Sequence, residues 1–159
     1  MRECIVPTLV LLFLPAVPPL RAQQDAWKPV DDSKGFCRIT APPDWTPLSD
    51  TSGAVVFKDA TTAMAVVTSQ PGQSFQPMPE AIQRMLRITK EKMFENTQKR
   101  TFYQDRTSRN ADDLNAFSIS VPAKNGTCSC HIVFLPTVSL ETVRKIALSL
   151  APAPPPVKE

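Results

Sequence analysis

The first 22 residues constrain this chain most, because they decide in which redox environment the remainder folds. A short charged start, Met1–Glu3, precedes a segment from Cys4 to Leu20 that carries no charge. Polar glutamines follow directly after Ala22. This layout is typical of a secretory signal peptide. We therefore expect residues 1–22 to be a signal peptide cleaved near Ala22, and the mature protein to be secreted or periplasmic.

The apolar part of this leader does not fit a transmembrane helix. Such a helix needs about 20 apolar residues that stay helical, and a proline inside a helix breaks or kinks it. The uncharged segment contains Pro7, Pro15, Pro18 and Pro19. We therefore expect no stable membrane span.

Length and charge limit the class of the mature chain. Removing residues 1–22 leaves 137 of the 159 residues, which suits one domain that buries a core without needing disulfides or metals. The formal net charge falls from +3 to +2, because the leader contains Arg2, Arg21 and Glu3. A charge this close to neutral does not favour nucleic acid as a partner.

Composition divides the mature chain into three parts. Residues 23–34 are polar and contain Lys28–Pro29, so we interpret them as a lead-in. Residues 35–150 carry the strand and helix patterns and form the expected domain. Residues 151–159 are rich in proline, which lacks a backbone donor, and we expect a disordered tail.

Several segments have the alternation or apolar runs of β-strands. An Asn125–Gly126 turn between two of them is a strong hairpin signal. A weaker strand pattern passes through Thr101–Tyr103. The other expected strands are Gly35–Thr40, Gly53–Lys58, Ala63–Ser69, Leu114–Val121 and Thr127–Leu135.

Two segments have helical periodicity. Pro79 suits a first helical position, and apolar residues then recur at spacings of three and four up to Met93. This spacing predicts a long helix that ends near Asn96 and buries its apolar face in the core. A second helix is expected after Ser139, which suits the N-cap and is followed by an apolar side that includes Leu140 and Val143. Antiparallel strands interrupted by helices indicate an α+β domain.

One segment carries a family resemblance. Phe36 to Trp45 reads Phe-Cys-Arg-Ile-Thr-Ala-Pro-Pro-Asp-Trp and resembles the opening strand and turn of PsbP-like domains, a superfamily that includes Ran-binding Mog proteins and small exported bacterial proteins. The order of elements over residues 35–150 is similar as well. The resemblance implies an antiparallel β-sheet flanked by helices on both faces, an α/β/α sandwich. It assigns no functional residue, because members share no catalytic site.

Three cysteines remain after the leader: Cys37, Cys128 and Cys130. An odd number in an oxidising compartment predicts one disulfide and one free thiol. On one strand Cys128 and Cys130 would be about 6.8 Å apart, at the upper edge of disulfide geometry. We therefore expect Cys37 to pair with Cys128 or Cys130, with its strand beside the late hairpin in one sheet. The alternative is a Cu(I) or Zn(II) site made by the three thiolates, which His131 could join only through a bend.

Catalytic patterns are weak. His131 is the only histidine and lies in an apolar strand, so a structural role outweighs membership of a Ser-His-acid triad. No Gly-x-Ser-x-Gly turn is present. Asp112–Asp113 could supply paired carboxylates in a small envelope enzyme, but adjacent aspartates before a strand also suit a turn. We expect no enzyme activity and no cofactor.

The segment from Arg84 to Arg109 carries a net positive charge of +5. A solvated helix face is ordinarily charged, so this pattern is compatible with a plain surface. If the protein has a contact surface, the cations best placed for it are Arg84, Arg87, Lys90 and Lys92. The sequence thus favours an exported, non-enzymatic binding or assembly module with a protein partner outside the cytoplasm. It does not name that partner.

Overall fold

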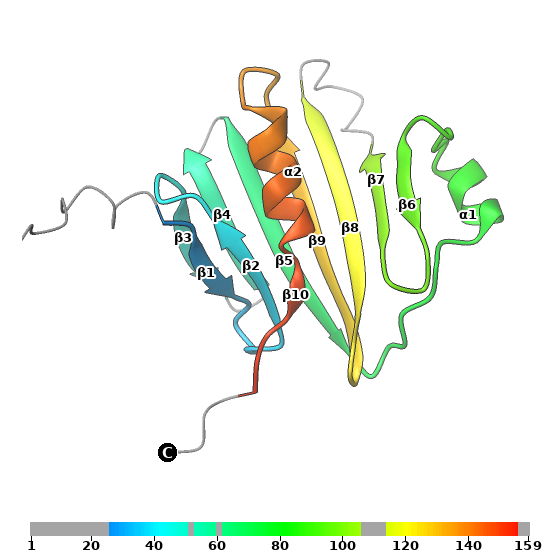
Figure 1. The fold of residues 1–159 in the computed structure, drawn as a ribbon, viewed down its shortest axis with the longest axis horizontal. Helices are drawn as coiled ribbons and strands as arrows, with labels where there is room; N and C mark the ends of the chain where they lie inside the picture. The colour runs from blue at the N-terminus through cyan, green and yellow to red at the C-terminus, as the bar shows by residue number, and fades with distance from the viewer. Residues whose placement is uncertain (1–25, 51–52, 60–61, 106–113, 156–159) are drawn as a thin grey trace, which may run out of the picture.

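The computed structural model describes residues 26–50, 53–59, 62–105 and 114–155 (Figure 1). The predicted signal peptide and the Asp112–Asp113 pair lie outside these residues. Within them, no helix is long and apolar enough to cross a membrane.

In the described part of the chain, the larger of two sheets has seven strands in the order β3-β4-β5-β9-β8-β7-β6. All neighbouring strands are antiparallel. The predicted β-hairpin is confirmed, because the strands on either side pair along their full length. Its two-residue turn is Lys124–Asn125, and Gly126 is already the first residue of the second strand, opposite Ala123. The strands are β3 (Thr46–Asp50), β4 (Gly53–Asp59), β5 (Ala63–Pro71), β6 (Met93–Asn96), β7 (Thr101–Asp105), β8 (Asn115–Ala123) and β9 (Gly126–Phe134).

The smaller sheet has the order β1-β2-β10. Its strands are β1 (Lys28–Asp31), β2 (Cys37–Ala41) and β10 (Ala151–Pro152). The turn between β1 and β2 is closed by the buried carboxylate of Asp32, which accepts hydrogen bonds from the backbone N–H groups of Phe36 and Cys37 at 2.6 and 3.1 Å. The polar lead-in expected at residues 23–34 therefore contains a strand.

The predicted disordered tail was wrong at its beginning. Ala151 and Pro152 pair with β2, and the Ala153 N–H donates to the Phe36 carbonyl at 2.9 Å. The edge of β2 that does not face β1 offers these backbone partners, and a proline-containing strand is tolerated at a sheet edge. Residues 156–159 lie outside the described part of the chain.

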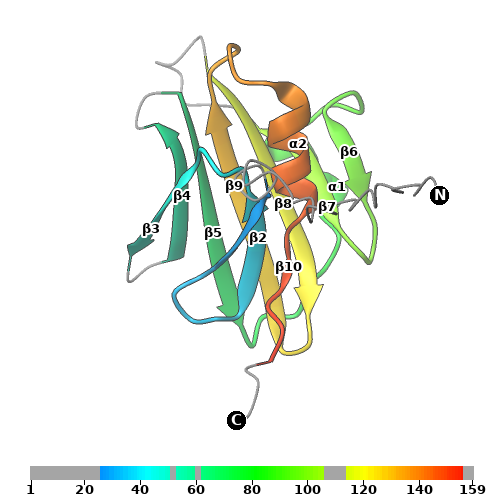
Figure 2. The same ribbon diagram turned by 60° about the vertical axis from the view of Figure 1, so that its left-hand side comes forward.

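The expectation that the opening strand shares a sheet with the late hairpin was also wrong. β9 already pairs with β5 on one side and β8 on the other, so it has no free edge. β2 instead packs across the face of the large sheet, as Figure 2 shows. Its alternating buried residues, Cys37, Ile39 and Ala41, are suited to that position because they point to one side of the strand.

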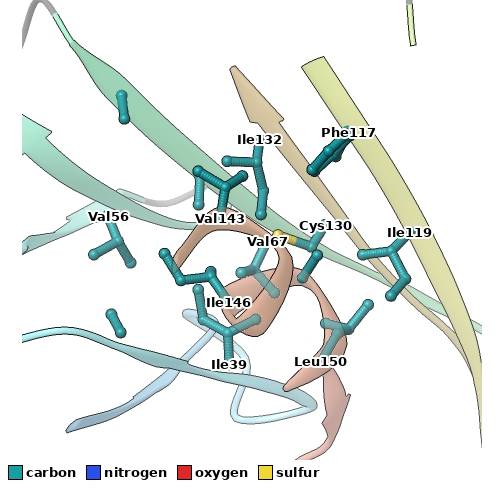
Figure 3. Packing of buried hydrophobic residues seen from close by; sticks show 14 of the residues in the cluster. Ile39, Val56, Val67, Phe117, Ile119, Cys130, Ile132, Val143, Ile146 and Leu150 are labelled. Atoms are coloured by element: carbon teal, nitrogen blue, oxygen red, sulfur yellow. The ribbon is translucent and has the colours of Figure 1, made fainter. Parts of the chain in front are cut away.

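The core lies between the large sheet and a layer formed by the small sheet and α2 (Leu140–Leu148). The expected helix after Ser139 is confirmed, and the Ser139 hydroxyl accepts a hydrogen bond from the Thr142 N–H at 3.4 Å. Val143 and Ile146 are fully buried against the sheet (Figure 3). We call this side of the large sheet the covered face and the opposite side the open face.

The predicted long helix was wrong. α1 is only six residues long (Glu80–Met85), and Arg87 then adopts a positive φ of 56°. Residues Met93–Asn96 form β6, which pairs with β7. A longer helix would have left the backbone groups of this β7 edge without a strand partner, and α1 buries no side chain to compensate.

The antiparallel sheet of the predicted α+β class is confirmed, but the described chain is mostly β with some helix. α2 shares the covered face with the small sheet, whereas α1 lies beyond the edge strand β6 (Figure 1). The apolar spacing from Pro79 to Met93 therefore does not belong to a helix that covers the sheet.

Candidate functional site

The four predicted contact residues lie together beyond the sheet edge. Arg84 is in the last turn of α1, and Arg87, Lys90 and Lys92 follow in the turns that lead to β6. The first three are exposed and Lys92 is half-buried. The structure thus groups these cations, although the long helix expected to carry them is absent.

Apolar side chains are exposed among these cations. The exposed fractions of Ile82, Met85 and Leu86 are 38%, 69% and 39%, and α1 has no buried residue. We call the group Ile82, Arg84, Met85, Leu86, Arg87, Lys90 and Lys92 the α1 surface. Sequence reasoning found its charges but assigned its apolar residues to the core.

The backbone that carries the α1 surface is anchored rather than free. Asn96 of β6 accepts a hydrogen bond from the Met78 N–H at 2.8 Å and donates one to the Met78 carbonyl at 2.9 Å. The Gln83 amide donates to the same carbonyl at 2.9 Å. A helix of six residues is marginal alone, so these contacts fix where α1 begins.

The cysteines lie on the covered face, where two of them are joined. Cys37 of β2 and Cys128 of β9 form a disulfide, with Cα atoms 5.6 Å apart, that links the two sheets. Cys130 is free and buried, and desolvation raises the pKa of its thiol to about 12. His131 lies on the opposite, open face because it is adjacent to Cys130 on a strand. The alternative ligand set is therefore not assembled, and the described residues contain no group of three or more His, Cys, Asp or Glu placed to hold a metal ion.

A polar network that the sequence did not reveal crosses the open face. The Ser118 hydroxyl of β8 donates to the Asp105 carboxylate of β7 at 2.8 Å and lies 2.8 Å from Nδ1 of His131 on β9. Tyr103 also hydrogen-bonds Ser118, and burial raises the pKa of its phenol. Small polar residues alternate along β8 and β9, and this alternation was the one sequence pattern that could have indicated the network. Only the pairing of β7 with β8 brings Asp105 to these residues.

This network contains the residue types of a hydrolase triad in a different geometry. In a triad the serine and the carboxylate contact opposite nitrogens of the histidine ring. Here Ser118 and Asp105 are both on the Nδ1 side, with Asp105 at 3.8 Å from that atom. Ser118 already donates its one proton to Asp105, so in this arrangement it is not activated as a nucleophile. The arrangement fits a hydrogen-bonded link between strands.

Beside the network is a groove of about 520 Å³ on the open face. Its floor contains Thr101 of β7, Ser120 of β8, and Thr127 and Ser129 of β9. One wall is the irregular segment 73–78, which we call the strap. None of the described residues that line the groove carries a formal charge.

Comparisons with known proteins define the fold and no more. No protein-family model matches the chain, and no curated protein sequence matches it. A crystal structure from Bacteroides thetaiotaomicron is similar, with a TM-score of 0.53 and 11% sequence identity. The match covers 81% of this chain and 48% of that chain, so this chain spans about half the length of that protein. At this identity the likeness concerns the fold alone.

Proposed function

We propose that the protein is an exported, non-enzymatic binding or assembly module that uses the α1 surface to contact an acidic protein partner. The observation that carries the proposal is the exposure of Ile82, Met85 and Leu86 among four cations. Exposed apolar groups that cluster on a surface favour a contact site, and methionine adapts to irregular partners.

The charge of the α1 surface favours a partner with carboxylates around an apolar contact. Arg84, Arg87 and Lys90 are exposed and lie within five residues of Met85 along the chain, so they would accelerate association with such a partner and exclude a basic one. An anionic lipid surface has some of the same chemistry. We favour a protein because the cations and the exposed apolar residues share one short segment that hydrogen bonds anchor to β6, which suits a defined binding partner.

The proposal is tested with the mature protein and a partner captured from its native envelope extract. The captured protein is purified, and its affinity is measured by calorimetry at two salt concentrations. Replacing Arg84, Arg87, Lys90 and Lys92 together by glutamate should weaken binding at least tenfold, because the introduced carboxylates would repel an acidic partner. The melting temperature should change little, since three of the four positions are exposed and surface substitutions usually cost little stability.

A charge-matched control separates the α1 surface from net charge. Glutamate at Lys28, Lys34, Lys99 and Lys124 makes the same charge change at exposed sites outside the α1 surface. Binding should be nearly unaffected in this control. Equal binding by the α1 variant and the wild type would contradict the proposal, as would binding only to phosphatidylglycerol vesicles and to no protein.

Two further parts of the proposal have their own support. Export is supported by the layout of residues 1–22. It is tested by recovering the protein from outside the cytoplasm and identifying its N-terminal residue by mass spectrometry, which should be near Gln23. A PsbP-like relationship is supported by the motif from Phe36 to Trp45 and by the antiparallel sheet.

A further inference from the structure

We propose that the groove on the open face binds a neutral saccharide. The site is separate from the α1 surface and does not depend on it. The proposal starts from the groove floor, where cross-strand pairing places hydroxyl residues in a row. Thr101 is opposite Ser120, and Ser120 is opposite Ser129. Neighbouring strands are about 4.8 Å apart, which sets the interval of this row. Thr101 is buried and donates its proton to Asn96 at 3.2 Å, whereas the half-buried Ser120 and Ser129 remain accessible from the groove.

The strap gives the groove a fixed wall. At one end the Thr127 hydroxyl donates to the Gln73 carbonyl at 2.8 Å. At the other end the Met78 N–H donates to Asn96 at 2.8 Å. Between these anchors Phe75 is half-buried and Gln76 is exposed, and both line the groove. The wall therefore adds an aromatic ring and a side-chain amide to the hydroxyl floor.

The lining chemistry selects the class of ligand. An ionic ligand would lose hydration here without gaining a charged partner from the described lining residues. Hydroxyl and amide groups both donate and accept hydrogen bonds, which matches a ligand rich in hydroxyls. Phe75 and Tyr103 add aromatic side chains that can contact the C–H faces of a sugar ring. The volume of about 520 Å³ is within the range of small-molecule sites.

A peptide fits this place less well. Extended peptides usually gain affinity by pairing with the free backbone of a sheet edge. The groove instead lies over β8 and β9, whose backbones pair with strands on both sides. What these strands present on the open face is side chains, including the Ser120 and Ser129 hydroxyls, which are 2.8 Å apart.

The test is a titration of isotope-labelled mature protein with small probe molecules, in which binding is monitored through the amide chemical shifts in two-dimensional NMR spectra. The probes are glucose, maltose, cellobiose, lactose and N,N′-diacetylchitobiose, with a sulfated disaccharide and a neutral tetrapeptide for comparison. At least one neutral saccharide should give saturable shifts confined to the strap and the groove floor. The sulfated sugar and the tetrapeptide should bind at least tenfold more weakly.

Variants connect binding to the groove itself. Ser120→Ala with Ser129→Ala should weaken saccharide binding at least tenfold, and Phe75→Leu, which keeps an apolar side chain on the strap but removes the ring, should also weaken it. Ser33→Ala, at an exposed turn outside the groove, is the matched control and should bind normally. The proposal is overturned if none of the saccharides binds at 10 mM, if the tetrapeptide binds best, or if the folded serine variant binds as well as the control.

Discussion

Removal of the disulfide between the two sheets should strongly destabilise this protein. Cys37 and Cys128 are 91 residues apart in sequence, and both side chains are fully buried. In the chain-entropy treatment, closing a loop of that length restricts the unfolded chain by about 4.6 kcal/mol at 25 °C. Domains of this size have free energies of unfolding of about 5–15 kcal/mol. The disulfide therefore represents a large share of the total.

The measurement is urea unfolding followed by the fluorescence of the buried Trp45. Cys130→Ala is the reference protein, because it removes the free thiol that could exchange with the disulfide. Adding Cys37→Ala and Cys128→Ala should lower the free energy of unfolding by about 3–5 kcal/mol. The urea m-value should rise, since the unfolded chain without the link exposes more surface.

The m-value distinguishes this explanation from a packing effect. If the two added alanines only created a small cavity, stability would fall without a change in m. A loss below about 1 kcal/mol would refute the reasoning, because it would mean that the closed loop does not restrict the unfolded ensemble.

Three other predictions follow from buried groups. Burial raises the pKa of the Cys130 thiol to about 12. At pH 8.5 this thiol in the native protein should therefore react with iodoacetamide about a thousandfold more slowly than an ordinary cysteine. Mass spectrometry should find one label, and only after the protein is unfolded without reductant. Ile146→Ala, at a fully buried position on α2, should cost about 2–5 kcal/mol in urea unfolding, whereas Leu148→Ala, which is 45% exposed, should cost under about 1 kcal/mol. Gly126→Ala should lower the melting temperature, because an added Cβ would overlap the Gln70 carbonyl oxygen; an unchanged melting temperature would show that β5 can move away.

Sequence patterns that depend on neighbouring residues predicted the structure well. The Asn125–Gly126 pair correctly indicated the β8–β9 hairpin, although the structure places the two-residue turn one position earlier, at Lys124–Asn125. Ser139 marked the start of α2 through its side-chain oxygen. The cysteine count, with the export that we expect, predicted one disulfide and one free thiol, as the structure has them. Alternation in Gly35–Thr40 identified the strand that the structure places at Cys37–Ala41.

The same patterns could not say what lies opposite each strand. Apolar spacing from Pro79 to Met93 suits a helix, but the unpaired edge of β7 gave residues 93–96 a strand partner. The edge of β2 likewise ordered Ala151 and Pro152, which composition alone had assigned to a disordered tail. In both cases a backbone hydrogen-bond partner remote in sequence decided the local conformation.

The candidate sites divide in the same way. The sequence by itself determined that Arg84, Arg87, Lys90 and Lys92 are close along the chain, because a short segment cannot separate them. Only the tertiary structure left α1 without a covering layer and so exposed the apolar side chains between these cations. The groove depends wholly on tertiary structure, since its hydroxyl row comes from three strands and its wall from a fourth segment. The register of the sheet, which no local pattern encodes, aligns Thr101, Ser120 and Ser129 in one row.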